Sequence, residues 1–197
     1  MHRRWLLCAL IALGPGCAPQ PVAQHVPATG WDRLPPDFWE QAIGDELRAL
    51  REPVISRDAG LAGLRSRYRL LLLNPYPPSY SKRIDVFEDG HAELTWISGS
   101  SALTRGEQSR SRRRLTAAEL ASLEAAIEAA ALPSQPRQER YPEGKICVDS
   151  TIFVFQYLDE DTEAFVVRDP CELDAGPQPL RELMERTLNL ERRPPSV

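Results

Sequence analysis

Histidine is scarce in this sequence, which has 3 histidines in 197 residues. His2 lies in a leader that we expect to be removed, His25 lies in a proline-rich stretch, and His91 follows a predicted turn. Catalytic triads and catalytic zinc sites usually depend on histidine. We therefore expect no histidine-based catalysis, no metal site and no cofactor, with the two remaining histidines solvated.

Basic residues are outnumbered as well. The chain has 24 Lys and Arg against 28 Asp and Glu, a net charge of −4, and removal of residues 1–16 would take away Arg3 and Arg4 and leave −6. Such a surface excludes nucleic acid as a partner. The sequence also has no HExxH pair, no glycine-rich phosphate loop and no nucleophile elbow.

Long hydrophobic runs are absent apart from one near the N-terminus. Trp5–Leu13 is a short apolar run that follows basic residues and precedes small or turn-forming residues and Cys17. This layout is typical of a secretory signal peptide, too short to span a bilayer as a helix. The segment resembles the lipobox of bacterial lipoproteins, with Leu13 one position early and Pro15 where Ala or Ser is preferred. The resemblance implies lipid attachment at Cys17; the alternative is cleavage near Ala18 and a freely periplasmic protein.

The chain is predicted to form one folded domain on a membrane tether. Because Ala rather than Asp follows Cys17, the resemblance implies an outer-membrane lipoprotein that faces the periplasm. The predicted parts are a signal peptide (1–16), the lipid-attachment cysteine with a Pro-rich tether (17–30), a helical arm (31–66), a single domain (67–190) and a flexible tail (191–197).

Alternation of apolar and polar residues predicts a mainly antiparallel sheet of hairpins. Asp89-Gly90 is a strong signal for a tight turn, and Asp159-Glu160-Asp161 separates a second pair of strands. The polar segment 98–111 is either a mobile loop or part of a further strand that ends at Arg114 and Leu115. The predicted strands are Tyr68–Leu73, Arg83–Glu88, His91–Ile97, Thr151–Leu158 and Glu163–Arg168.

Three helices are predicted from apolar periodicity. The first shows its apolar face from Trp39 to Leu50 and stops at Pro53. The second begins with a capping box at Thr116 and Glu119, and a closing amphipathic helix ends at Leu190. The expected fold class is α+β, with the two later helices packed on one face of the sheet and an N-terminal helical arm.

The cysteines have separate predicted fates. Cys8 leaves with the signal peptide and the lipid occupies the next cysteine, so Cys147 and Cys171 remain as a pair in an oxidising compartment. Opposed residues in an antiparallel pair have a constant sum of residue numbers, and the sum for these cysteines also sets Phe153 opposite Phe165. This register closes the hairpin near Asp159; the alternative is a turn centred a residue or two later. We predict a disulfide across the base of the second hairpin that stabilises the fold by about 3 to 4 kcal/mol. Free or metal-binding thiols are the alternative, for which further ligands are lacking.

The order of elements resembles that of small exported proteins of Gram-negative bacteria. The resemblance covers residues 68–190 and rests on the Asp89-Gly90 hairpin, the L-T-x-x-E-L helix start at Leu115–Leu120, the Cys147-x-Asp149 strand entry and the closing helix. It implies export, and it brings no known activity with it.

Two surface features are candidates for partner binding. Clustered guanidinium groups bind phosphate and carboxylate bidentately, so an arginine cluster could face lipid phosphates, peptidoglycan or lipopolysaccharide. The alternative is a solvated strand edge whose charges prevent aggregation. Tyr76 and Tyr80 in a proline-rich stretch could anchor a partner or pack a loop. The arginines are Arg110, Arg112, Arg113 and Arg114.

We expect a non-enzymatic envelope lipoprotein that binds or supports another envelope protein or polymer. One alternative is a periplasmic inhibitor or immunity-like protein. Another is a carboxylate-dependent hydrolase of an envelope polymer, which needs two acidic side chains in one cleft. Asp149 is its preferred candidate because a fixed environment beside Cys147 could shift its pKa, although turn bonding is the simpler role. The other candidates are Asp85, Glu88 and Asp169.

Lipid attachment is tested by growing cells with a palmitate analogue. We expect the wild-type protein to incorporate the label and to remain with membranes, whereas Cys17→Ser should do neither because it lacks the acceptor thiol. A Cys17→Ser protein that is processed and labelled like the wild type would contradict lipidation.

Overall fold

A computed structural model describes residues 38–57, 61, 63–74, 78–99, 108–137, 151–175 and 177–190. Its centre is one six-stranded antiparallel sheet in the order β4-β3-β2-β1-β5-β6. The strands are β1 (Leu64–Leu73), β2 (Ser79–Phe87), β3 (Ala92–Gly99), β4 (Ser109–Arg114), β5 (Ile152–Asp159) and β6 (Glu163–Arg168). The helices are α1 (Phe38–Ala49), α2 (Ala117–Ala130), the 3-10 turn η3 (Leu132–Ser134), α3 (Pro170–Ala175) and α4 (Gln178–Asn189).

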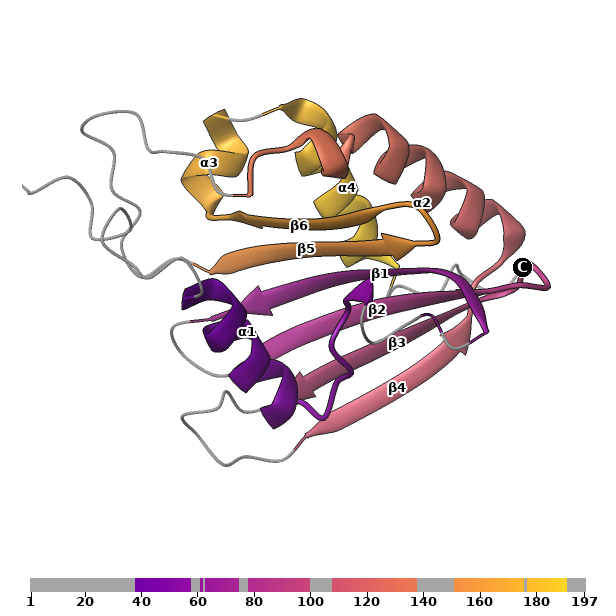
Figure 1. Cartoon of the computed structure of the whole chain (residues 1–197), viewed down its shortest axis with the longest axis horizontal. Coiled ribbons are helices and arrows are strands. Elements are labelled where there is room, and N and C mark those ends of the chain that lie inside the picture. Colours follow the sequence, from indigo (N-terminus) through magenta and orange to yellow (C-terminus); the bar gives the residue numbers. More distant parts are fainter. Residues whose placement is uncertain are drawn as a thin grey trace, which may run out of the picture.

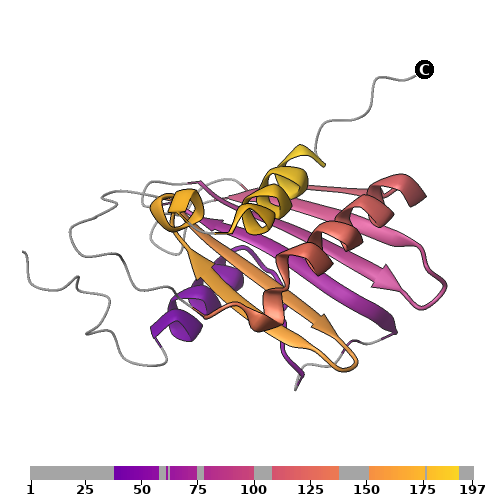
Figure 2. The ribbon, with the colours of Figure 1, turned by 90° about the horizontal axis from the view of Figure 1, so that it is seen from above.

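The sheet separates two apolar cores. Tyr68, Leu70 and Phe155 belong to the core under α2 and α4, whereas Leu71 and Val154 pack with α1 on the other face. This division follows from the alternation of side chains along a strand. Figures 1 and 2 show the resulting layers, with α1 on one face and α2 beside α4 on the other. The predicted α+β class and its helix placement are therefore confirmed.

The N-terminal helix covers the second face of the sheet. Trp39, Ile43, Leu47 and Leu50 are all buried against it, as their periodicity predicts. The boundary predicted at residue 66 falls inside β1, which begins at Leu64. Among the described residues, no helix is both long and apolar enough to cross a membrane.

The first hairpin forms at the predicted turn. Gly90 has a φ of 83°, a left-handed conformation that glycine adopts without strain, and the Asp89 carboxylate accepts a hydrogen bond from the His91 amide. The sequence allowed either a loop or a strand before Arg114. The residues of β4 form a strand at the edge of the sheet, paired with β3.

The preferred register of the second hairpin is wrong, and the alternative holds, with the turn centred between Glu160 and Asp161. Phe153 pairs with Arg168, three positions beyond the predicted Phe165. The reason is the turn: the Asp159 carboxylate accepts hydrogen bonds from the amides of Asp161 and Thr162, so Asp159 opens the turn and is not its centre.

The expected position of Cys171 on a strand is also wrong. The chain leaves the sheet after Arg168, and Cys171 lies in the short helix α3. Cys171 is a disulfide-bonded cysteine. Cys147 lies outside the described residues, so the pairing of these two cysteines stays a prediction, without the strand geometry that first suggested it.

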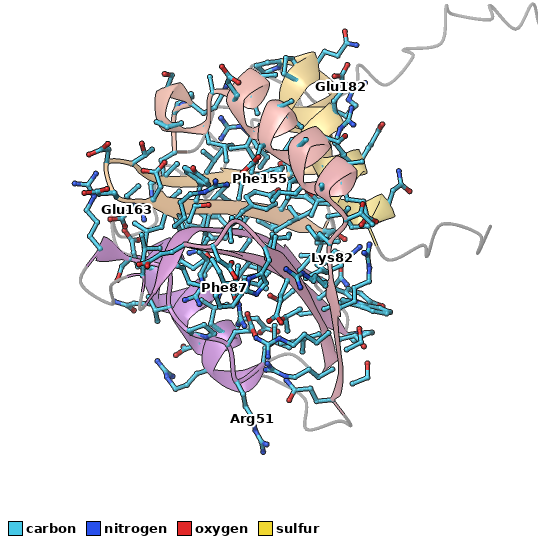
Figure 3. The ribbon with its side chains drawn as sticks, turned by 90° about the vertical axis from the view of Figure 1, so that its right-hand side faces the viewer. Arg51, Lys82, Phe87, Phe155, Glu163 and Glu182 are labelled. Atoms are coloured by element: carbon cyan, nitrogen blue, oxygen red, sulfur yellow. The ribbon has the colours of Figure 1, made fainter. Side chains whose placement is uncertain are left out.

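The ends of α2 and α4 are tied to the sheet by charged side chains. The predicted capping box is present: Thr116 Oγ1 accepts from the Glu119 amide, and the Glu119 carboxylate accepts from the Thr116 amide. Arg113 donates to Glu119 and to the Leu190 carbonyl, and Lys82 donates to the Leu188 carbonyl. These cations complement the carbonyls and dipole at the C-terminal end of α4. Figure 3 labels Lys82 of β2 and Phe155 of β5.

The Glu119 contacts make stability depend on pH. Hydrogen bonds from Arg113 and Thr116 lower the pKa of Glu119 from 4.5 to about 2. Because the folded-state pKa is the lower one, this contribution is complete above pH 4.5 and is lost as the pH falls towards 2. We expect the unfolding free energy of Glu119→Gln to fall less across this interval than that of the wild type in urea melts. Parallel losses in both proteins would show that Glu119 has no such role.

Candidate functional site

Two neighbouring rows of side chains on the α1 face of the sheet are polar, although most of that face is apolar. Strand pairing places them side by side, because paired residues in an antiparallel sheet project to the same face. One row runs Arg112, Thr95, Arg83, Arg69 and Gln156, and the other runs Arg114, Glu93, Asp85 and Arg67.

We call this region the arginine belt. It comprises six guanidinium groups and three carboxylates, an excess of three positive charges in a chain whose net charge is −4. Its members are Arg67, Arg69, Arg83, Arg110, Arg112 and Arg114 with Glu52, Asp85 and Glu93.

Glu52 is the buried hub of the belt. The chain leaves α1 through Arg51, whose φ of 53° is left-handed, and the Glu52 amide donates to the Leu47 carbonyl at 2.8 Å. This turn sends the Glu52 side chain inward, while Arg51 extends away from the protein in Figure 3. The Glu52 carboxylate accepts from Arg83 Nη1 at 2.7 Å and from Arg69 Nη2 at 3.3 Å.

The position of Glu52 compensates the repulsion between two buried arginines. Arg69 and Arg83 are directly opposed in the β1–β2 register, an arrangement of like charges that destabilises a sheet. The Glu52 carboxylate binds both arginines and so compensates their repulsion. A second carboxylate, that of Asp85, accepts hydrogen bonds from Arg83 Nε at 3.0 Å and from Arg67 Nε at 2.5 Å. The three arginines of the two strands are thus joined through these two acids.

Arg69 is the most buried member of the belt, with 0% exposure. Burial lowers the pKa of Arg69 from 12.5 to about 10; Arg83 and Arg67 act in the same direction and Glu52 opposes them. The guanidinium therefore stays charged at neutral pH. Its Nη1 donates to Gln156 at 3.0 Å and its Nη2 to the Pro53 carbonyl, but within the described structure its Nε has no partner.

Thr95 Oγ1, between two arginines of the belt, is a second buried polar atom without a partner among the described residues. Thr95 pairs with Arg83 on one side and Arg112 on the other, so it lies in the row of Arg69. Buried polar groups are rarely left unbonded in proteins. Together with the excess of positive charge, the unpaired N–H of Arg69 makes the belt rich in donors.

The belt opens to solvent at the sheet edge. Side-chain exposure rises from 0% at Arg69 to 59% at Arg112, and Arg114 is exposed as well. Arg112 binds Glu93 at 2.6 Å, and Arg114 has no ion pair in the described part of the chain. Arg110 donates to the Arg51 carbonyl at 3.1 Å and lies 3.5 Å from Glu52.

The predicted arginine cluster is therefore divided between the two faces of the sheet. Arg110, Arg112 and Arg114 project to the belt, whereas Arg113 projects to the other face and binds Glu119 of α2. Sequence reasoning missed Arg67, Arg69, Arg83 and Glu52 as site residues. Of these, only Arg67 and Arg69 have a sequence signal, which is their alternation with Arg65 along β1.

The other predicted site residues are dispersed or undescribed. Tyr80 is half-buried on β2, while Tyr76, Cys17 and Asp149 lie outside the described residues. Of the hydrolase candidates, Asp85 is held by arginines in the belt, Glu88 is exposed at the first hairpin, and Asp169 is buried just after β6. Within the described ranges, no three His, Cys, Asp or Glu side chains are grouped as metal ligands.

Comparison of the sequence with models of known protein families gives no match, and no curated protein matches it.

Proposed function

We propose that the protein is a non-enzymatic, lipid-anchored protein of the cell envelope that binds an anionic envelope component at the open end of the arginine belt. The observation that carries the proposal is the excess of three positive charges in the belt, with Arg112 and Arg114 exposed at the β4 edge. Guanidinium groups bind phosphate and carboxylate groups through paired hydrogen bonds.

The chemistry of the belt supports binding in preference to catalysis. Each of its three carboxylates is held by at least one arginine: Glu52 by Arg69 and Arg83, Asp85 by Arg67 and Arg83, and Glu93 by Arg112. An arginine keeps its proton under ordinary conditions and offers only donors. The belt thus supplies fixed positive charge and hydrogen-bond donors, which suit an anion.

The buried end of the belt supports its exposed end. Arg110 is tied to the main chain after α1, and its strand pairs along its length with β3. β4 is thereby held in place against the sheet, which fixes the spacing of Arg112 and Arg114. Rigid placement of donors lowers the entropy lost when a ligand binds.

The proposal is tested with three anionic probes: purified peptidoglycan, lipopolysaccharide, and vesicles that contain phosphatidylglycerol. We expect the purified mature protein to bind at least one of them, and to bind more weakly as salt increases because the attraction is electrostatic. The double variant Arg112→Glu, Arg114→Glu should bind at least tenfold more weakly in co-sedimentation or titration.

Arg186→Glu is the matched control, because Arg186 is an exposed arginine on α4, on the opposite face of the sheet. It should bind like the wild type. Equal losses in the control and the double variant, salt-independent binding, or no binding to any of the three probes would each refute the proposal.

A further inference from the structure

A cavity of about 510 Å³ lies on the other face of the sheet, between α2 and strands β1, β2 and β5. Its interior is apolar and includes Ile84 and Val86 from β2 and Leu120, Leu123 and Ile127 from α2. This volume is in the range of small-molecule binding sites, which are usually apolar with a few polar groups at fixed positions. None of its lining residues belongs to the arginine belt.

The mouth of the cavity is shaped by a β-bulge. The β1–β2 register shifts between Leu64 and Ser66, so Arg65 is an extra residue that is released from the alternation of the strand. Its guanidinium reaches α2 and binds Glu124. Arg65 and Glu124 therefore form a bridge between the sheet and the helix at the rim.

The rim carries more negative than positive charge. Glu124, Glu128 and Asp159 face a single cation, Arg65, which leaves an excess of two negative charges. Glu124 is paired with Arg65, and the Asp159 carboxylate accepts hydrogen bonds from amides of its own turn. Glu128 is exposed and makes no ion pair in the ranges that the structure describes, so its carboxylate is available to a ligand.

Tyr157 adds a further acceptor beside these carboxylates. Its hydroxyl donates to Asp159 Oδ2 at 2.8 Å and accepts a hydrogen bond from the Ser66 side chain, which leaves one oxygen lone pair for a ligand. Burial first, and then the neighbouring Asp159, raise the pKa of Tyr157 to about 12, so the hydroxyl keeps its proton. This end of the cavity therefore offers the carboxylates of Glu124, Glu128 and Asp159 and the Tyr157 oxygen as acceptors, beside the donors of Arg65 and Thr162.

We propose that this cavity binds a small amphiphile with an apolar chain and a protonated amine. The chain would lie among Ile84, Val86 and Ile127, and the ammonium group would bind at the rim near Glu128 and Tyr157. The three donors of an ammonium group match a rim of acceptors with negative charge. This proposal is independent of the belt and stands whether or not the belt binds anions.

Hexylamine, hexanol and hexanoate, titrated into the full-length protein, distinguish charge from simple apolar burial. The three probes share a six-carbon chain and differ in the charge of the head group. We expect hexylamine at pH 7 to bind saturably in calorimetry, at least fivefold more tightly than hexanol, and hexanoate not to bind. Hexanol binding as tightly as hexylamine, or no saturable binding of hexylamine, would overturn the proposal.

Two variants at the cavity and one control locate the site. Glu128→Gln should weaken hexylamine at least threefold and leave hexanol unchanged, whereas Glu185→Gln, an exposed position on α4, should leave both unchanged. Ile127→Trp should abolish binding by filling the cavity. If Ile127→Trp fails to fold, Glu128→Gln decides alone, because Glu128 is exposed and its replacement keeps the side-chain shape. Hexylamine affinity that is unaffected by Glu128→Gln would overturn the site.

Discussion

One buried carboxylate, Glu52, holds together parts of the chain that would otherwise repel each other. Arg69 and Arg83 face each other on adjacent central strands, and Glu52 binds both from outside the sheet. Moving charges from water into the protein interior costs free energy. Removing one member of a buried ion-pair network then leaves the remaining charges uncompensated. The segment after α1, which returns over the sheet, therefore supplies the acid that the two opposed arginines share.

The hydrogen bonds from Arg69 and Arg83 to Glu52 also fix the position of α1 on the sheet. Apolar packing of Ile43 and Leu47 against Leu71 and Val154 provides most of the adhesion, since it removes apolar surface from water. It does not by itself choose a unique position, because apolar packing is non-directional. The hydrogen bonds to Glu52 supply direction, and Arg110 extends the connection to the edge strand β4. On both faces, charged side chains thus give direction to helices that apolar packing holds: Glu52 with Arg69 and Arg83 on the α1 face, and Arg113 and Lys82 at the ends of α2 and α4 on the other.

Local patterns made much of the fold predictable. The capping box at Thr116 and the Asp89-Gly90 turn depend on residues close together in the sequence, and both formed as expected. The preferred register of the second hairpin was wrong because Asp159 opens the turn, where its carboxylate accepts hydrogen bonds from the amides that follow. This shifts every pairing between the two strands. Composition alone does not show which acidic residue of such a turn will make those bonds.

Most residues of the candidate site could not be predicted from the sequence, for a different reason. Arg67 and Arg69 alternate with apolar residues, and this is the pattern of a strand with one solvated face. That face is instead covered, in part by a residue 17 positions before Arg69. Only the strand order brings Arg83 and Arg112 into the same row, so the belt appears when five separate segments are placed together.

A double-mutant cycle on Glu52 and Arg69 tests most directly whether Glu52 is the hub. Denaturant melts would give the unfolding free energies of the wild type, Glu52→Gln, Arg69→Met and the double variant. We expect Glu52→Gln alone to cost about 3 to 5 kcal/mol, because it leaves two opposed buried arginines without their shared acid. Replacing Arg69 as well should recover part of that loss, so that the double variant is at least about 1 kcal/mol more stable than the two single effects added together would make it. Additive effects, or a Glu52→Gln variant as stable as the wild type, would contradict the role of Glu52.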